Sequence, residues 1–305
     1  MGGGLAGHEL AAAVAGAGGL GTIGILAPPQ LERELAAARE RVEHGRPIAV
    51  NLLLPFTRRG HWEVAQHADA VVTFWGRPKR RTPNTWIHQC GSVEEALAAR
   101  AAGADAVIAQ GVEAGGHVRG TTPALELLER TRAGLGPGYP VLVAGGIAEA
   151  ADVGAALDAG AEAAVLGTRF LMTEESEART AYKQRLMEAR ETVLTELFGA
   201  GWPRAPHRVI WNEATERWLA RDRRGPAWVR ALHIALSPAL SRVPLSQRDR
   251  LARAQRADRP LLGPLAASEG GPRNLLDSGP LYAGETVARI HDLRPAAELV
   301  AELHR

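Results

Sequence analysis

The chain has 305 residues, of which 46% are hydrophobic and 23% are charged, so it can bury a sizeable core and disorder is not expected. The formal net charge is only +2 and no basic run is interleaved with aromatic residues, which argues against a nucleic-acid partner. The single cysteine, Cys90, excludes an intrachain disulfide and a CxxC motif, and is interpreted as a small buried apolar residue. No apolar run is long enough to span a membrane, and we expect a cytoplasmic protein.

Up to about residue 170, short runs rich in β-branched residues alternate with Ala-rich amphipathic runs. This alternation is typical of βαβ units and a parallel sheet. Helices are expected over residues 9–14, 29–43, 93–102, 122–132 and 149–159, the third with Ser92 as its N-cap. Strands are expected over residues 22–26, 48–53, 70–74, 85–89, 106–110, 141–144 and 163–166.

The number of strands is informative, because a closed (β/α)8 barrel needs eight and only seven are predicted. The chain opens with Met1 and three glycines, which is typical of a loop, and continues directly into a helix. We therefore expect an α/β, TIM-like (β/α)8 barrel that lacks its first strand. Strands 22–26 and 163–166 would then each carry an unpaired edge.

After residue 175 the pattern changes. Residues 176–195 are predicted as one long helix, and tryptophans, prolines and Arg-rich helical segments follow to about residue 260. The tryptophans are interpreted as core, residues 262–279 as a loop, and residues 287–304 as a final helix. We expect a barrel over residues 1–179, a helical appendage domain over 180–280, and a tail over 281–305 that returns to the barrel.

Residues 16–21 (GAGGLG) match the GxGxxG pattern of dinucleotide-binding folds. That interpretation requires a strand before the glycines and a helix after them. Here the predicted order is the reverse. The glycines are therefore interpreted as a tight loop between a helix and a strand.

Two neighbouring strands end in glycine pairs that suit a phosphate group. Strand 141–144 is followed by Gly145 and Gly146, and strand 163–166 by Gly167 and Thr168. In (β/α)8 barrels the loops after the last two strands commonly bind phosphate, and glycines let backbone N–H groups approach the anion. The alternative is that these glycines only permit tight turns.

His117 ends the loop Glu113-Ala114-Gly115-Gly116-His117, which follows strand 106–110. The carboxyl ends of barrel strands carry the catalytic residues, and an imidazole can act as a general base there. The alternative is a histidine that serves only packing. Glu113 and His117 have no evident third partner, so no metal site is predicted.

Amide side chains also stand at strand ends where a core would prefer apolar residues: Asn51, Gln89 and Gln110. All three would face the same mouth of the barrel, where amides can meet the edge of a flavin ring. The alternative is that each amide satisfies a neighbouring backbone group.

Together these motifs resemble the nitronate monooxygenases, also called 2-nitropropane dioxygenases. The loop EAGGH at residues 113–117, combined with AGGI at 144–147 and GTRFL at 167–171, carries the specific part of the resemblance. Further matching stretches are GGLG at 18–21, VNL at 50–52, VVTFWG at 71–76, ADAV at 104–107 and LYAG at 281–284. The FMN-dependent enoyl-ACP reductases are related and share the Gly-Gly-His loop.

The resemblance implies a barrel that holds non-covalent FMN, with the helical domain over its mouth as a substrate or lid domain. His117 matches the catalytic histidine, and Met1 falls where the family has a methionine that approaches the flavin. The FMN phosphate would be held by Gly145, Gly146, Gly167 and Thr168. The flavin would be lined by Asn51, Gln89, Gln110, Gly115, Gly116 and Ala144.

The resemblance further implies oxidation of alkyl nitronates or nitroalkanes with dioxygen. Two alternatives stay open: an enoyl-ACP or enoyl-thioester reductase that uses FMN and NAD(P)H, and a barrel that lost its first strand together with catalytic activity. The small-molecule partners would be the nitronate or nitroalkane and dioxygen. The sequence leaves the oligomeric state open, a homodimer included.

Overall fold

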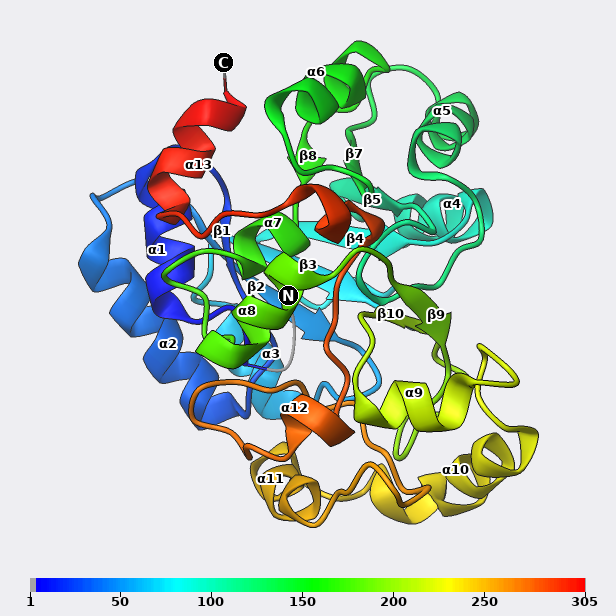
Figure 1. Cartoon of the computed structure of the whole chain (residues 1–305). Helices are drawn as coiled ribbons and strands as arrows, with labels where there is room; N and C mark the ends of the chain where they lie inside the picture. Colours follow the sequence, from blue (N-terminus) through cyan, green and yellow to red (C-terminus); the bar gives the residue numbers. More distant parts are fainter. Residues whose placement is uncertain (1–3, 305) are drawn as a thin grey trace.

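The computed structural model describes residues 4–304 and contains an open, curled parallel sheet (Figure 1). Its order is β1-β2-β3-β4-β5-β7-β8, and every neighbouring pair is parallel. The expected fold, a TIM-like barrel short of one strand, is confirmed, and Met1 lies outside the described residues. The strands are β1 (Gly21–Ile23), β2 (Ile48–Leu53), β3 (Ala70–Phe74), β4 (Thr85–Cys90), β5 (Ala106–Gln110), β7 (Val141–Ala144) and β8 (Ala164–Val165).

Helices cover the outer face of this sheet, and most lie where the sequence predicts them. Ser92 caps α4 by accepting a hydrogen bond from the Glu95 backbone N–H at 3.3 Å. Cys90 is buried and free, as expected. The helices are α1 (His8–Gly16), α2 (Pro28–Arg41), α3 (Arg59–Ala65), α4 (Val93–Ala101), α5 (Ala124–Leu135) and α6 (Ala150–Asp158), of which α3 was not predicted.

The strands alternate between an outer and an inner set of side chains, as the two-residue period of a strand requires. In β2, Ile48, Val50 and Leu52 pack outwards against the helices, while Ala49 faces inwards. The inner cluster is built mainly from small and β-branched side chains: Ala49, Ala70, Val72, Ile87, Ala106, Ile108 and Ala144. The same alternation aims the residues at the strand ends into the mouth of the barrel.

The prediction of one helix over residues 176–195 is wrong. The structure has α8 (Thr180–Glu188), then β9 (Val193–Thr195), because the β-branched run after residue 192 pairs with β10 (His207–Val209). A two-residue strand, β6 (Gly116–His117), pairs with the other side of β10. This small antiparallel sheet holds the His117 loop against a segment far along the chain.

The remaining elements surround the mouth and the open side of the barrel. The predicted helix over 287–304 is interrupted, because Pro295 cannot continue a helix from the preceding turn. The predicted loop 262–279 contains one short helix. The elements are α7 (Thr168–Leu171), α9 (Glu213–Leu219), α10 (Ala227–Leu240), α11 (Leu245–Arg253), α12 (Leu275–Ser278), the 3-10 helix η1 (Glu285–Arg289) and α13 (Ala296–Leu303).

Helix packing bridges the gap between the two edge strands, β1 and β8. The helix α13 packs against α1 on the β1 side and against α6 on the β8 side (Figure 1). Among the described residues, no helix has the length and apolar character to cross a membrane. The division at residues 179 and 280 stays a prediction.

The glycine-rich loop before β1 follows α1, which confirms the order helix, loop, strand. Gly21 is required there by close packing, since a Cβ atom at this position would lie 1.9 Å from the Ala11 carbonyl oxygen. The first strand of the sheet therefore lies directly against α1.

We expect Gly21→Ala to lower the free energy of unfolding by about 1–3 kcal/mol, because the strand must move away from α1 to admit the methyl group. Gly154→Ala is the matched control, since Gly154 lies within α6 and a Cβ there meets nothing within 4 Å. The control should leave stability unchanged or raise it. Urea denaturation measures both, and equal midpoints for the two variants would contradict the packing argument.

Candidate active site

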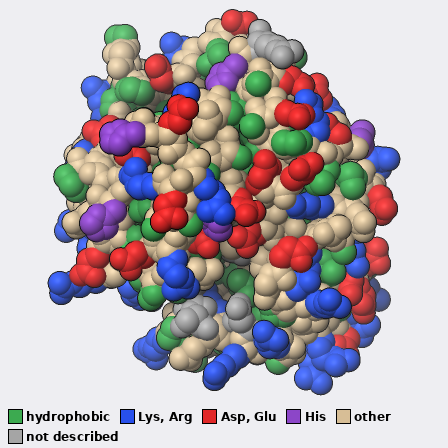
Figure 2. All heavy atoms as spheres, turned by 90° about the vertical axis from the view of Figure 1, so that its left-hand side faces the viewer, with side chains coloured by type: hydrophobic (Ala, Val, Ile, Leu, Met, Phe, Trp, Pro, Cys, Tyr) green, Lys and Arg blue, Asp and Glu red, His purple; other side chains and the backbone are tan. Residues whose placement is uncertain are grey.

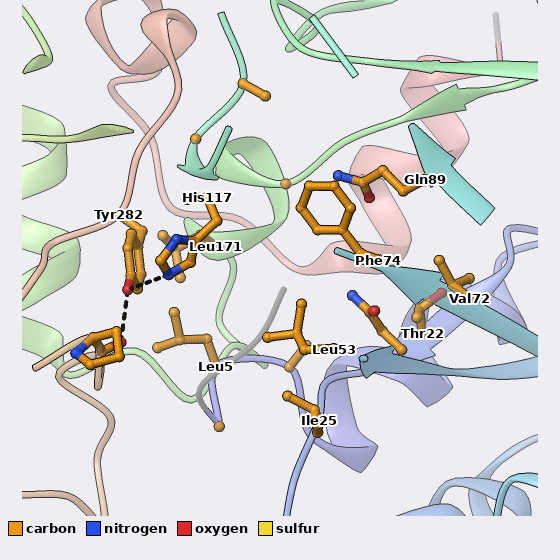
Figure 3. A pocket seen from close by; sticks show the side chains of 18 of the residues that line it. Leu5, Thr22, Ile25, Leu53, Val72, Phe74, Gln89, His117, Leu171 and Tyr282 are labelled. Atoms are coloured by element: carbon orange, nitrogen blue, oxygen red, sulfur yellow. Dashed lines mark hydrogen bonds between the residues drawn. The ribbon is translucent and has the colours of Figure 1, made fainter. Parts of the chain in front are cut away.

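A cavity of about 1620 Å³ opens at the carboxyl ends of the strands. It is lined by the inner residues of the sheet, by the loops after β5, β7 and β8, and by residues that follow β9 and α10. Figure 3 shows part of it, where Gln89 and Phe74 lie on one side and His117 and Tyr282 on the other. Such a volume exceeds that of a typical single-ligand pocket of roughly 300–1,000 Å³.

The three predicted amides all line this cavity. Asn51 carries a buried Oδ1 atom that has no hydrogen-bond partner among the described residues. Gln110 is already engaged, since its Nε2 donates to the His117 carbonyl at 3.0 Å and its Oε1 accepts from the Arg119 N–H at 3.4 Å. Gln110 therefore shapes the His117 loop, whereas the Asn51 amide oxygen is left without a partner among the described residues.

The predicted phosphate loops come together on the same cavity wall. Gly145 and Gly146 adopt φ angles of 110° and 74°, which only glycine reaches without strain. The backbone N–H groups of Gly145, Gly146 and Gly167 have no acceptor in the described part of the chain. A Cβ atom at Gly167 would meet nothing within 4 Å. These unpaired donors beside open space form a cradle suited to an anion.

The His117 loop is held from two sides. His117 pairs with His207 across β6 and β10, and the Val118 N–H donates to the Pro206 carbonyl at 2.9 Å. On the other side, a Cβ at Gly115 would lie 2.4 Å from the Gly284 backbone nitrogen, so only glycine lets the tail approach. The Gly284 N–H in turn donates to Thr168 Oγ1 at 2.8 Å. The tail thus connects the histidine loop to the glycine cradle.

Aromatic rings surround the His117 imidazole. The Trp202 ring lies 3.8 Å away between centroids, the Tyr282 ring 5.6 Å and the Trp75 ring 6.0 Å. Burial, with the nearby His207, lowers the pKa of His117 well below its usual value near 6.5. The imidazole is therefore neutral at physiological pH.

The hydrogen bonds of His117 indicate which nitrogen is free to accept a proton. Nδ1 lies 3.3 Å from the Ala205 carbonyl oxygen, which can only accept, so this contact is satisfied by the tautomer that carries its proton on Nδ1. Nε2 lies 3.3 Å from the Tyr282 hydroxyl, which donates its own proton to the Pro264 carbonyl at 2.7 Å (Figure 3). In the tautomer protonated on Nδ1, Nε2 is the unprotonated nitrogen, and it lies beside the Tyr282 hydroxyl on the cavity wall.

Glu113, the other titratable residue of the loop, does not join His117. Its carboxylate accepts hydrogen bonds from the Ala124 N–H at 3.0 and 3.2 Å and so caps α5. Glu113 also lines the cavity, but its carboxylate is engaged in ordering the loop after β5.

The sequence analysis did not identify Trp202 or Tyr282 as site residues. Trp202 was interpreted as core of the appendage, but it stacks on His117 and lines the cavity. Tyr282 belonged to the matching stretch LYAG, without a stated role. The matching stretch LYAG could therefore have indicated Tyr282. No neighbouring residue in the sequence distinguished Trp202 from Trp211 or Trp218, which do pack against a hydrophobic cluster.

Two solved structures resemble this chain over its whole length. A nitroalkane oxidase from Streptomyces ansochromogenes is 29% identical with a TM-score of 0.75, covering 100% of this chain and 92% of that one. FabK from Thermotoga maritima is 26% identical with a TM-score of 0.75, covering 100% and 90%. Both likenesses extend over the whole fold described above.

Sequence relatives point the same way. A hydroxy-methyl-oxo-octahydroindene carboxyl-CoA dehydrogenase of Mycobacterium tuberculosis is 34% identical over 228 residues, and the match covers 70% of this chain and 62% of the relative. A probable nitronate monooxygenase of Staphylococcus saprophyticus is 31% identical over 267 residues, covering 67% and 72%. The nitronate monooxygenase family profile matches residues 79–305. The chain belongs to the nitronate monooxygenase family, a family of oxidoreductases.

Proposed function

We propose that this chain binds FMN without a covalent bond and oxidises alkyl nitronates and nitroalkanes with dioxygen. The observation that carries the proposal is the neutral His117 imidazole on the wall of a cavity that also contains an anion cradle. The family and the likeness to a nitroalkane oxidase support it. The small-molecule partners would be the nitronate or nitroalkane and dioxygen.

The residues present fit FMN. The unpaired N–H groups of Gly145, Gly146 and Gly167 suit its phosphate, and the Asn51 amide lines the same cavity, where it would lie near the ring. Gln89, Gly115, Gly116, Ala144 and Thr168 line the same cavity. When bound, FMN would supply the oxidation of the substrate, taking electrons from it and passing them to dioxygen.

The protein would contribute proton transfer and orientation. A neutral nitroalkane carries an acidic proton on the carbon next to its nitro group, and Nε2 of His117 would remove it to leave the nitronate anion. The Ala205 carbonyl would then face an Nδ1–H that carries more positive charge, which strengthens their hydrogen bond. Trp202 and Tyr282 would exclude water beside the imidazole.

The likeness to FabK favours a second candidate, an enoyl-thioester reductase that also needs NAD(P)H. The two activities separate in one assay, because oxygen uptake with ethylnitronate requires no nicotinamide. NADH oxidation that depends on an enoyl thioester, without nitronate oxidation, would favour the second candidate.

We expect Gly167→Val to weaken FMN binding by about tenfold or more, because a Cβ there meets no protein atom within 4 Å and the side chain would occupy the space beside the cradle. Gly270→Val is the control, since a Cβ there also meets nothing within 4 Å and Gly270 does not line the cavity. Flavin fluorescence titration measures the Kd for FMN. Equal affinities of the two variants for FMN would show that the FMN phosphate does not bind at this wall of the cavity.

We expect His117→Ala to lower the turnover of neutral nitroethane by roughly 10²–10⁴-fold, because the general base is lost. Oxidation of preformed ethylnitronate should fall much less, since its proton is already gone. Oxygen uptake measures both, with the exposed His67→Ala as control. Retention of full nitroethane turnover would show that another group removes the proton.

The lowered pKa of His117 predicts the shape of the pH profile. Because the folded protein keeps the imidazole neutral below its usual pKa, kcat/KM for nitroethane should stay constant as the pH falls through about 6.5 and decline only at lower pH. Steady-state oxygen uptake across this range tests it. A decline of kcat/KM with its midpoint at or above about pH 6.5 would mean that burial does not lower the pKa of His117.

A further inference from the structure

Three side chains of the kinds that bind metal ions come together outside the candidate active site, where α1, α2 and the segment after α7 meet. His8 begins α1, Glu34 lies in α2, and Glu177 follows α7. One ligand atom from each side chain, an imidazole nitrogen or a carboxylate oxygen, lies within 4.8 Å of the other two. The three residues are far apart in the sequence, so no local motif indicates this cluster.

His8 and Glu34 are in direct contact. Nδ1 of the His8 ring lies 2.7 Å from Oε2 of Glu34, and the His8 backbone N–H donates to the same oxygen at 2.8 Å. Their side chains are 23% and 17% exposed, so the pair is open to an ion from solvent. Figure 2 views the molecule from the side on which α1 and α2 lie in Figure 1, and histidine and acidic side chains reach this surface.

Glu177 brings a second carboxylate to this pair. A Cβ atom at Gly7 would lie 2.6 Å from Oε1 of Glu177 and 3.0 Å from Oε2 of Glu34, so the lack of a side chain at Gly7 lets both oxygens occupy this space. Among the described side chains, Glu34 pairs with His8, and no arginine or lysine pairs with Glu177. The cluster therefore holds two carboxylates and one imidazole.

The charges in the cluster are unbalanced. Burial, and then the charge of Glu34, raises the pKa of Glu177 above its usual value. The nearby Glu9 carboxylate adds to this rise, whereas His8 opposes it. Two carboxylates held beside a neutral imidazole repel each other, so a cation among them would relieve the repulsion.

Capping of α1 accounts for only part of this cluster. A carboxylate is stabilised at a helix N-terminus, and the hydrogen bond from the His8 N–H to Glu34 serves that purpose. A second carboxylate and an imidazole are more than this one cap requires. A set of one imidazole nitrogen and two carboxylate oxygens suits Zn²⁺ and similar transition-metal ions, whereas Mg²⁺ and Ca²⁺ prefer oxygen ligands alone.

We propose that His8, Glu34 and Glu177 bind one divalent transition-metal cation of the Zn²⁺ type, with water completing its coordination. Ligand atoms at about 2.0–2.1 Å from a tetrahedral Zn²⁺ lie roughly 3.3 Å from each other. The His8–Glu34 contact of 2.7 Å would therefore open by roughly 0.6 Å to admit the ion. The proposal is independent of the proposed reaction, because none of the three residues lines the cavity.

The ion would tie together three segments beside the first strand of the sheet. The Glu177 N–H donates to the Leu5 carbonyl at 3.1 Å, and the Gly24 N–H, just after β1, donates to the Ala6 carbonyl at 3.0 Å. Leu5 and Ala6 both line the cavity. A metal at His8 and Glu177 would thus stabilise the wall of the cavity next to β1.

The test is calorimetric titration of the full chain, freed of metal, with Zn²⁺ and with Mg²⁺. Zn²⁺ should bind with one ion per chain, and its Kd should be roughly tenfold or more below that of Mg²⁺. His8→Ala and Glu177→Gln should each raise the Kd for Zn²⁺ by about tenfold or more, because each removes one ligand. Saturating Zn²⁺ should also raise the melting temperature, since the ion binds the folded chain.

Glu9→Gln is the matched control. It removes the same charge beside the cluster as Glu177→Gln does, but the Glu9 side chain is 59% exposed, pairs with Arg41 and is not one of the three ligands. Its Kd for Zn²⁺ should stay within about threefold of that of the unchanged chain. Without metal, Glu177→Gln should melt at or above the temperature of the unchanged chain, because it removes the repulsion from Glu34. Loss of Zn²⁺ binding in this variant would then not be due to unfolding.

Two outcomes would overturn the inference. One is a melting temperature that Zn²⁺ leaves unchanged together with no measurable binding heat, which would leave Glu34 as a cap of α1 alone. The other is Zn²⁺ binding of unchanged affinity in the His8→Ala, Glu177→Gln double variant, which would mean that the ion binds elsewhere. Neither measurement involves flavin or nitroethane, so failure of this inference is distinguishable from failure of the proposed function.

Discussion

The candidate site depends on the backbone pairing of His117 with His207. A histidine after two glycines has little conformational order of its own, because glycine populates a wide range of backbone angles. Pairing with β10 fixes the direction of the loop, and it brings Ala205, Trp202 and the small antiparallel sheet against the imidazole. The Ala205 contact and the Trp202 stacking follow from this pairing, and the burial that they add contributes to the lowered pKa of His117.

The parallel sheet could be predicted closely because its signal is local. Buried β-branched runs predicted β2, β3, β5 and β7 to the residue, and the two-residue period then placed Asn51, Gln89 and Gln110 inside the mouth. The glycine loops after β7 and β8 likewise needed only their position at strand ends. These predictions required no knowledge of the distant segments that pack against the strands and loops.

Other parts could not be predicted, because their conformation depends on distant partners. The run 193–195 reads equally well as the end of a helix, and becomes β9 only when β10 lies beside it. For Gln110 the sequence left open a ligand or a neighbouring backbone group as partner, and its amide binds the backbone of the His117 loop. Trp202 carries no local mark of its place on the cavity, since it reaches the cavity through tertiary packing. The roles of the site residues stay predictions.

The open side of the sheet has a mechanical consequence. Because β1 and β8 do not hydrogen-bond to each other, no continuous ring of strand hydrogen bonds fixes the width of the cavity. The helix α13 joins the two sides only through its packing on α1 and α6. A ligand that contacts both Asn51 on β2 and Gly167 after β8 would act as a strut between the two ends of the sheet. Ligand binding would then stabilise this side against opening, and opening of this side would in turn weaken ligand binding.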